Sequence, residues 1–178
     1  MTPLRRRLQI PLLLLVLSAA CGPSSDSTAT SPAKVDACTV FTYEDAKAIA
    51  GESLASMAST LDEAMGRDPS ECLYNSGTLE QPRILSLLIR YHRSPEKARR
   101  LQESSRSSLG NVSGSKVRDI SGLGDGAIWV GGRIQQLHVL AGSRQLIITV
   151  QSPDGTDQLP KARQAAVKIL ARLKPGQK

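Results

Sequence analysis

Residues 134–150 read IQQLHVLAGSRQLIITV, and this pattern predicts two strands joined by a tight turn. Apolar side chains alternate along the second strand, which places Leu146, Ile148 and Val150 on one face. Gly142 and Ser143 match a two-residue hairpin turn that has glycine first. Strands joined in this way are antiparallel, so the hairpin predicts an antiparallel sheet.

The sequence on both sides of the hairpin extends this sheet. Residues 83–91 alternate clearly, with one apolar face made by Leu85, Leu87, Ile89 and Tyr91. Shorter strands are predicted over residues 71–75, 117–120 and 127–130. The order of these segments predicts an α+β fold, in which two or three helices pack on one face of an antiparallel meander.

Three helices are predicted from their capping residues and apolar spacing. They cover residues 42–50 after the N-cap Thr42, about 95–108 after the N-cap Ser94, and about 160–173. Residues 52–68 are ambiguous. Their apolar residues recur at helical spacing and suggest a further short helix: Leu54, Met57, Leu61 and Met65.

Composition limits the classes of function. The chain has 178 residues, of which 40% are hydrophobic and 22% charged, as expected for one globular domain. Aromatic residues make up only 3%, which argues against a stacking platform for single-stranded nucleic acid. Two histidines and three cysteines leave little material for a metal site. We therefore expect neither a nucleic-acid partner nor a metal or other cofactor.

The first 20 residues predict a secretory leader. Three arginines at residues 5–7 precede an apolar run over residues 10–17, and then the small residues of 18–20 precede Cys21. The apolar run is too short to span a bilayer. Leu-Ser-Ala-Ala-Cys, residues 17–21, resembles the signal of bacterial lipoproteins, although Ser18 stands where leucine is preferred. The alternative is an ordinary signal peptide on a secreted protein.

The lipoprotein resemblance implies that Cys21 is acylated and becomes the mature N-terminus. It predicts a domain organisation of leader (1–20), lipidated cysteine and tether (21–35) and one folded domain (36–178). The tether residues are small or polar, and a flexible chain of this length reaches roughly 20 Å. The expected location is the bacterial cell envelope, held at a membrane by lipid and facing the periplasm or exterior. Because Gly22 rather than aspartate follows the cysteine, the outer membrane is expected where the host has two.

Cys38 and Cys72 remain once Cys21 carries lipid. An even pair of cysteines outside the cytoplasm predicts a disulfide bond. The alternative is a pair of buried free thiols.

Charge is distributed unevenly along the chain. Residues 22–80 hold ten acidic and three basic residues, a net charge of −7, whereas residues 81–178 hold seventeen basic and six acidic residues, a net charge of +11. Either a basic face attracts an anionic envelope component or an envelope protein, or the two halves neutralise each other inside the fold. The favoured binding patch comprises Arg90, Arg93, Arg99 and Arg100.

A second resemblance covers most of residues 36–173. The segments Cys38-Thr-Val-Phe-Thr-Tyr-Glu-Asp-Ala, Glu71-Cys-Leu-Tyr74 and Gly122-Leu-Gly-Asp125 resemble small envelope lipoproteins whose domain has no assigned function. This resemblance implies a disulfide-bridged domain and supplies no catalytic residues. We therefore expect a non-catalytic binding or scaffolding module. The alternative is an envelope hydrolase that uses Ser113 and Lys116, whose spacing matches Ser-x-x-Lys, or His138.

Overall fold

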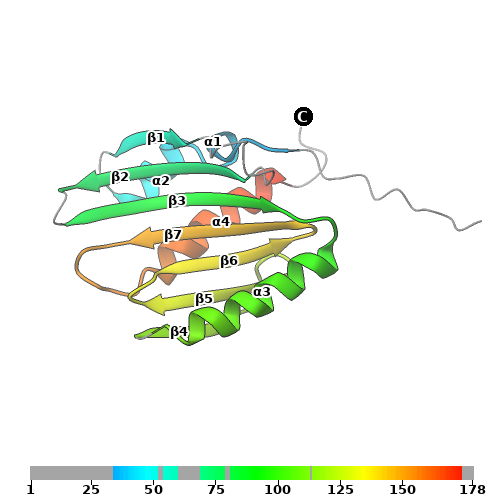
Figure 1. Ribbon diagram of the computed structural model, residues 1–178. Helices are drawn as coiled ribbons and strands as arrows, with labels where there is room; N and C mark the ends of the chain where they lie inside the picture. The colour runs from blue at the N-terminus through cyan, green and yellow to red at the C-terminus, as the bar shows by residue number, and fades with distance from the viewer. Residues whose placement is uncertain (1–33, 52–53, 60–68, 79–80, 113, 174–178) are drawn as a thin grey trace, which may run out of the picture.

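A computed structural model describes residues 34–51, 54–59, 69–78, 81–112 and 114–173. Its centre is an antiparallel sheet with the strand order β1-β2-β3-β7-β6-β5-β4 (Figure 1). Two meanders, β1 to β3 and β4 to β7, therefore join side by side where β3 pairs with β7. The strands are β1 (Ala55–Ser59), β2 (Ser70–Gly77), β3 (Pro82–Tyr91), β4 (Ser115–Ile120), β5 (Gly126–Gly132), β6 (Gln136–Ala141) and β7 (Arg144–Gln151).

Helices cover both faces of this sheet. They are α1 (Ala37–Val40), α2 (Tyr43–Ala50), α3 (Pro95–Gly110) and α4 (Leu159–Leu173). The first two and α4 pack on one face, whereas α3 crosses the other face over the β4–β7 half (Figure 1). The predicted α+β fold with an antiparallel meander is thus confirmed, and two of the three predicted helices, α2 and α4, share one face together with α1, which was not predicted. The position of α3 on the opposite face is a departure from the sequence prediction.

The main core lies between the sheet and helices α1, α2 and α4. Cross-strand register aligns Leu87 of β3, Ile148 of β7 and Leu137 of β6 in one row, and all three are fully buried. Burying such aliphatic side chains stabilises the fold by about 1.5–3 kcal/mol each. The largest of the other fully buried side chains in this core are Trp129, Phe41, Ile89, Leu146 and Ile169.

The predicted hairpin between β6 and β7 is present, and its turn lies at Gly142 and Ser143 as predicted. Ala141 pairs with Arg144 across the turn, and Gly142 has φ 61°. No residue other than glycine has a positive φ in the described part of the chain. The turn therefore needs its special backbone conformation only at its first central position, as in a type II′ turn.

Part of the ambiguous segment is a strand, so the prediction of a helix there is wrong over residues 55–59. These residues form β1, which pairs with β2, and in the backbone register Ala58 is the partner of Cys72. Hydrogen bonding to the backbone of β2 stabilises the strand more than the weak helical spacing of Leu54 and Met57 favours a helix, because tertiary pairing overrides a local pattern. Leu61 and Met65 lie outside the described residues.

A disulfide joins Cys38 of α1 to Cys72 of β2, with a Cα–Cα distance of 5.0 Å. The predicted bond is therefore present. It closes a loop of 34 residues and ties the first helix to the sheet. Cys21 and the leader lie outside the described residues. None of the helices in the described part of the chain is both long and apolar enough to cross a bilayer.

An ion-pair cluster fixes α2 against α4. Asp45 is 5% exposed, and its carboxylate forms ion pairs with Arg172 and with Lys168. The Nζ of Lys168 lies 3.2 Å from Oδ1 of Asp45. The same carboxylate completes the capping box with Thr42 at the start of α2. Burial raises the pKa of Asp45, but the hydrogen bonds from Arg172, Thr42 and Lys168 outweigh it and hold the pKa well below its usual range. At this corner the acidic and basic halves of the sequence neutralise each other.

Candidate functional site

Four exposed arginines gather at the junction between β3 and α3. Arg90 is the penultimate residue of β3, Arg93 follows the strand, and Arg99 and Arg100 lie early in α3. We call Arg90, Arg93, Arg99 and Arg100 the arginine cluster. These four residues are the binding patch predicted from the sequence, and they stand on β3, on α3 and on the short connection between them.

The local sequence fixes this junction. Ser94 caps α3 by accepting a hydrogen bond from the backbone N–H of Lys97, at 3.2 Å, and Pro95 occupies the first turn. The backbone N–H of His92 donates to the carbonyl oxygen of Ser143 in the β6–β7 hairpin, at 2.8 Å. The arginines thus project from a backbone that is held at both sides of the turn.

The arginine cluster has no carboxylate partner in the part of the chain that the structure describes. Other arginines are paired: Arg106 binds Asp119 through both guanidinium nitrogens, and Arg118 binds Asp157 at 2.7 Å. Lys97 adds a further exposed positive charge beside the cluster. The exposed charges of the cluster therefore form no salt bridge within the described residues, and Glu96 on the same helix is an opposing charge near Arg99 and Arg100.

The positive potential at the junction acts on neighbouring titratable groups. Burial, followed by the charge of Arg90, lowers the pKa of His92, although a hydrogen bond with Gln145 opposes this. The pKa of Glu96 is lowered mainly by its own backbone N–H and by Ser94, and then by Arg99 and Arg100. Glu96 is the one acidic residue of the first turn of α3.

The first described residues of the chain meet the sheet beside the arginine cluster. The backbone N–H of Val35 donates to the hydroxyl of Tyr91 at 2.6 Å, and that hydroxyl donates to the carbonyl oxygen of Val35 at 3.0 Å. Tyr91 follows Arg90 directly in β3. In Figure 1 the blue start of the chain lies at the same end of the sheet as the arrowhead of β3 and the start of α3. Sequence reasoning placed Tyr91 on the core face but gave no signal for this contact.

A polar layer lies between α3 and the sheet. His138 of β6 is 3% exposed, and its Nε2 lies 3.2 Å from Oε1 of Gln136. Gln102 of α3 and Gln145 of β7 are also buried. Burial and, second, the charge of Arg90 lower the pKa of His138 to about 4, so the ring is neutral at neutral pH.

The structure places Lys116 and His138, the two described residues of the hydrolase alternative, apart from each other. Lys116 is exposed on β4, where it pairs with Gly131 of β5. Gly131 is two residues from Trp129 and therefore on the same face of the sheet, and Trp129 lies in the main core. Lys116 is thus on the core face. His138 pairs with Ile128 and so lies on the α3 face. The two side chains occupy opposite faces of the sheet. Ser113 lies outside the described residues.

The glycine-rich turn at residues 122–126 supports the hairpin. A Cβ on Gly124 would come within 2.1 Å of the carbonyl oxygen of Leu140, so the close approach requires glycine. That carbonyl accepts from the backbone N–H of Asp125 at 2.8 Å, and the carboxylate of Asp125 accepts from the N–H of Gly142 at 2.6 Å. The turn thus holds the β6–β7 hairpin through backbone contacts.

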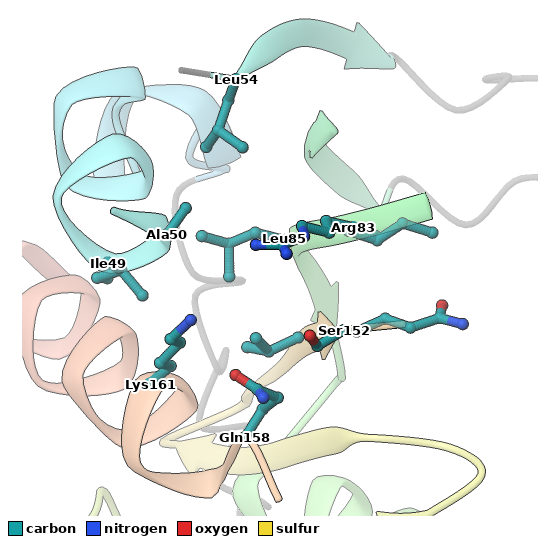
Figure 2. A pocket seen from close by; sticks show the side chains of 11 residues that line it. Ile49, Ala50, Leu54, Arg83, Leu85, Ser152, Gln158 and Lys161 are labelled. Atoms are coloured by element: carbon teal, nitrogen blue, oxygen red, sulfur yellow. The ribbon is translucent and has the colours of Figure 1, made fainter. Parts of the chain in front are cut away.

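A small hollow opens between α2, the start of α4 and the ends of β3 and β7. Lys161 and Gln158 lie across it from the apolar side chains of Ile49 and Leu85 (Figure 2). Its volume is about 30 Å³, which is room for about one or two water molecules. No group of three or more His, Cys, Asp or Glu side chains that could hold a metal ion occurs among the described residues.

Comparisons of this chain with protein-family models, curated proteins and solved structures find no match. The resemblance of residues 36–173 to small envelope lipoproteins therefore stays a prediction. The role of the arginine cluster has to be inferred from its own geometry and charge.

Proposed function

We propose that this chain is a lipid-anchored lipoprotein of the bacterial cell envelope and serves there as a non-catalytic binding module. The observation that carries the anchor is the order of arginines 5–7, an apolar run, and Leu-Ser-Ala-Ala-Cys at residues 17–21. Acyl chains on Cys21 would hold the protein at a membrane, since each buried CH₂ contributes about 0.8 kcal/mol.

The Cys38–Cys72 disulfide supports an envelope location. Disulfides form and persist in oxidising compartments and are rare in the bacterial cytoplasm. A leader that exports the chain would bring both cysteines into such a compartment.

Two features of the domain support binding without catalysis. Lys116 and His138 are on opposite faces of the sheet, and the hollow at the start of α4 has room for about one or two water molecules. The arginine cluster, in contrast, offers four exposed cations that form no salt bridge among the described residues. An exposed basic surface suits an anionic component of the envelope or an envelope protein.

Metabolic labelling with radioactive palmitate tests the anchor. Cells producing the full chain should yield a labelled band, and mass spectrometry of its N-terminal peptide should place the acyl groups on Cys21. The variant Cys21→Ser should lose the label, while the matched variant Cys38→Ser, which removes a different cysteine, should keep it. A labelled Cys21→Ser protein, or an unmodified thiol at residue 21 in the native product, would overturn the proposal.

A further inference from the structure

We propose that the arginine cluster docks the folded domain onto an anionic lipid bilayer, beside the point where the tether enters the domain. This inference rests on the proposed lipid anchor and names the ligand of the binding module. The surface consists of Arg90, Arg93, Arg99 and Arg100, with Lys97 and Leu101 next to them on α3.

Charge complementarity is the first argument. Arg106, Arg118, Lys168 and Arg172 each bind a carboxylate of the fold, but the four arginines of the cluster bind none in the described part of the chain. Two glutamates on α3 oppose this charge: Glu96, whose pKa Arg99 and Arg100 lower, and Glu103, one helical turn after them. Four arginines and Lys97 against these two glutamates leave the surface positive. Each arginine near an anionic bilayer strengthens association by about fivefold. Planar guanidinium groups also suit the phosphate groups of lipids.

The position of the tether is the second and independent argument. Val35 is bound to the hydroxyl of Tyr91 on the face of the sheet that α1 and α4 cover, whereas the neighbouring Arg90 lies on the α3 face. Both residues stand at the same end of β3, so the tether enters the domain at the end of the sheet that carries the arginine cluster. Thirteen residues lie between Cys21 and Val35, and a chain of that length spans roughly 20 Å. A lipid on Cys21 therefore keeps this end of the domain close to the bilayer. Attraction by surface charge extends about 8 Å at physiological salt, and a tether of roughly 20 Å lets this end of the domain come within that range.

The exposed side of α3 fits a membrane interface. Leu101, at 36% exposure, is one of the few large apolar side chains that the described surface displays, and it follows Arg100 directly. Helices that lie on bilayers combine basic side chains with an exposed apolar residue of this kind. Another such residue, Val167 on α4, lies on the far side of the sheet from α3. The two positions therefore report on opposite faces of the domain.

The test uses the full lipidated protein in vesicles. Cys21 carries lipid and Cys38 is bonded to Cys72, so Leu101→Cys or Val167→Cys would add one reactive thiol for a fluorophore. The vesicles contain phosphatidylcholine alone or with 30% phosphatidylglycerol, and a trace of lipid with a spin-labelled headgroup quenches a nearby label. Docking predicts quenching at residue 101 in anionic vesicles at 0.1 M salt. Three controls should show little quenching: residue 167 in the same anionic vesicles, residue 101 in neutral vesicles, and residue 101 in anionic vesicles at 1 M salt.

Matched variants locate the interaction. Arg99→Gln with Arg100→Gln should lower the ratio of docked to undocked domains by about 25-fold, at fivefold for each charge. Lys116→Gln with Arg133→Gln removes two exposed bases that lie outside the cluster and have no salt bridge among the described residues. That control should leave quenching unchanged. Inorganic phosphate should act no more strongly than sodium chloride of equal ionic strength, because a bilayer presents many headgroups together.

Each outcome decides for or against the inference. Equal quenching in neutral vesicles, quenching at residue 167, or no effect of the Arg99/Arg100 variant would overturn it. So would release by phosphate alone, or a fluorophore at residue 101 that responds to polyglutamate and to no vesicle, which would indicate an acidic protein partner. An unmodified Cys21 defeats the proposed function together with this inference. A lipidated protein whose domain stays undocked defeats only the inference.

Discussion

Two basic regions of this molecule are used differently. At the α2–α4 corner, Lys168 and Arg172 bind the carboxylate of Asp45, and Arg172 also donates to the carbonyl oxygen of Val40 at 2.9 Å. At the β3–α3 junction, the arginine cluster has four positive charges instead of two and forms no salt bridge among the described residues. The first region uses its charge to hold helices together. The second leaves its charge available to a partner.

This difference bears on the two interpretations of the uneven charge along the chain. Internal neutralisation of the acidic half by the basic half occurs at Asp45, whereas the arginine cluster remains exposed. The net charge of +11 over residues 81–178 therefore includes cations that pair within the fold and arginines that do not. Variants that affect stability in one region and association in the other should separate them.

The largest expected effect is on stability, through the disulfide. Replacing both cysteines, as Cys38→Ala with Cys72→Ala, should lower the free energy of unfolding by about 3.5–4 kcal/mol, because the unfolded chain loses a 34-residue loop constraint. Urea denaturation followed by the fluorescence of Trp129 measures this change. Vesicle docking by the remaining folded protein should persist, since the bond lies away from α3. A loss below 1 kcal/mol would contradict the entropic argument.

The next effect is a dependence of the free energy of unfolding on pH, and it is due to the buried ring of His138. The pKa of His138 is about 4 in the folded state and about 6.5 when unfolded, so the unfolded state takes up the proton first. Its contribution to stability is therefore complete above pH 6.5 and is lost as the pH falls toward 4. Between pH 7.5 and 5.0 the loss should be about 2 kcal/mol.

His138→Gln should remove most of that dependence, while His92→Gln serves as the matched control for the less buried ring at the junction. Denaturation curves at the two pH values compare all three proteins. An unchanged slope in His138→Gln would contradict burial of the neutral ring as the cause.

A smaller effect is expected at the α2–α4 corner. Asp45→Asn removes the acceptor of Arg172 and Lys168 and should cost about 1–2 kcal/mol, since both cations are about 40% exposed and water screens the pair. The folded pKa of Asp45 is depressed, so its contribution is present above about pH 3.9 and is lost as the pH falls further. The variant should thus lose less stability between pH 5 and 3 than the parent. Vesicle docking should not change.

Local patterns predicted much of the fold and part of this contrast. Alternation in residues 83–91 and 144–150 identified β3 and β7 and their core face, and Ser94 and Pro95 marked the start of α3. The strand β1 was missed because its pairing with β2 depends on a partner distant in sequence. The opposite position of α3 was missed because its short buried stripe, Ala98 and Gln102, carries little apolar signal.

For the candidate site, too, the sequence predicted the features that are local and missed those that depend on distant residues. The arginines were found as a group because they are neighbours in sequence around one strand–helix junction. Their lack of carboxylate partners could not be read from the sequence, since it depends on where Asp119 and Asp157 lie after folding. The contact between Val35 and Tyr91 joins residues 56 positions apart and left no local pattern.

The smallest expected effect on stability is in the arginine cluster, and it completes the contrast. Arg99→Gln with Arg100→Gln should change the free energy of unfolding by less than about 0.5 kcal/mol, because exposed side chains that form no salt bridge contribute little to the fold. Loss of mutual repulsion between the arginines makes a slight gain at low salt the expected direction, and 1 M salt should abolish it. Denaturation in both salt concentrations measures this. A loss as large as that of Asp45→Asn would show that these arginines hold the fold together, and the two basic regions would then serve one purpose.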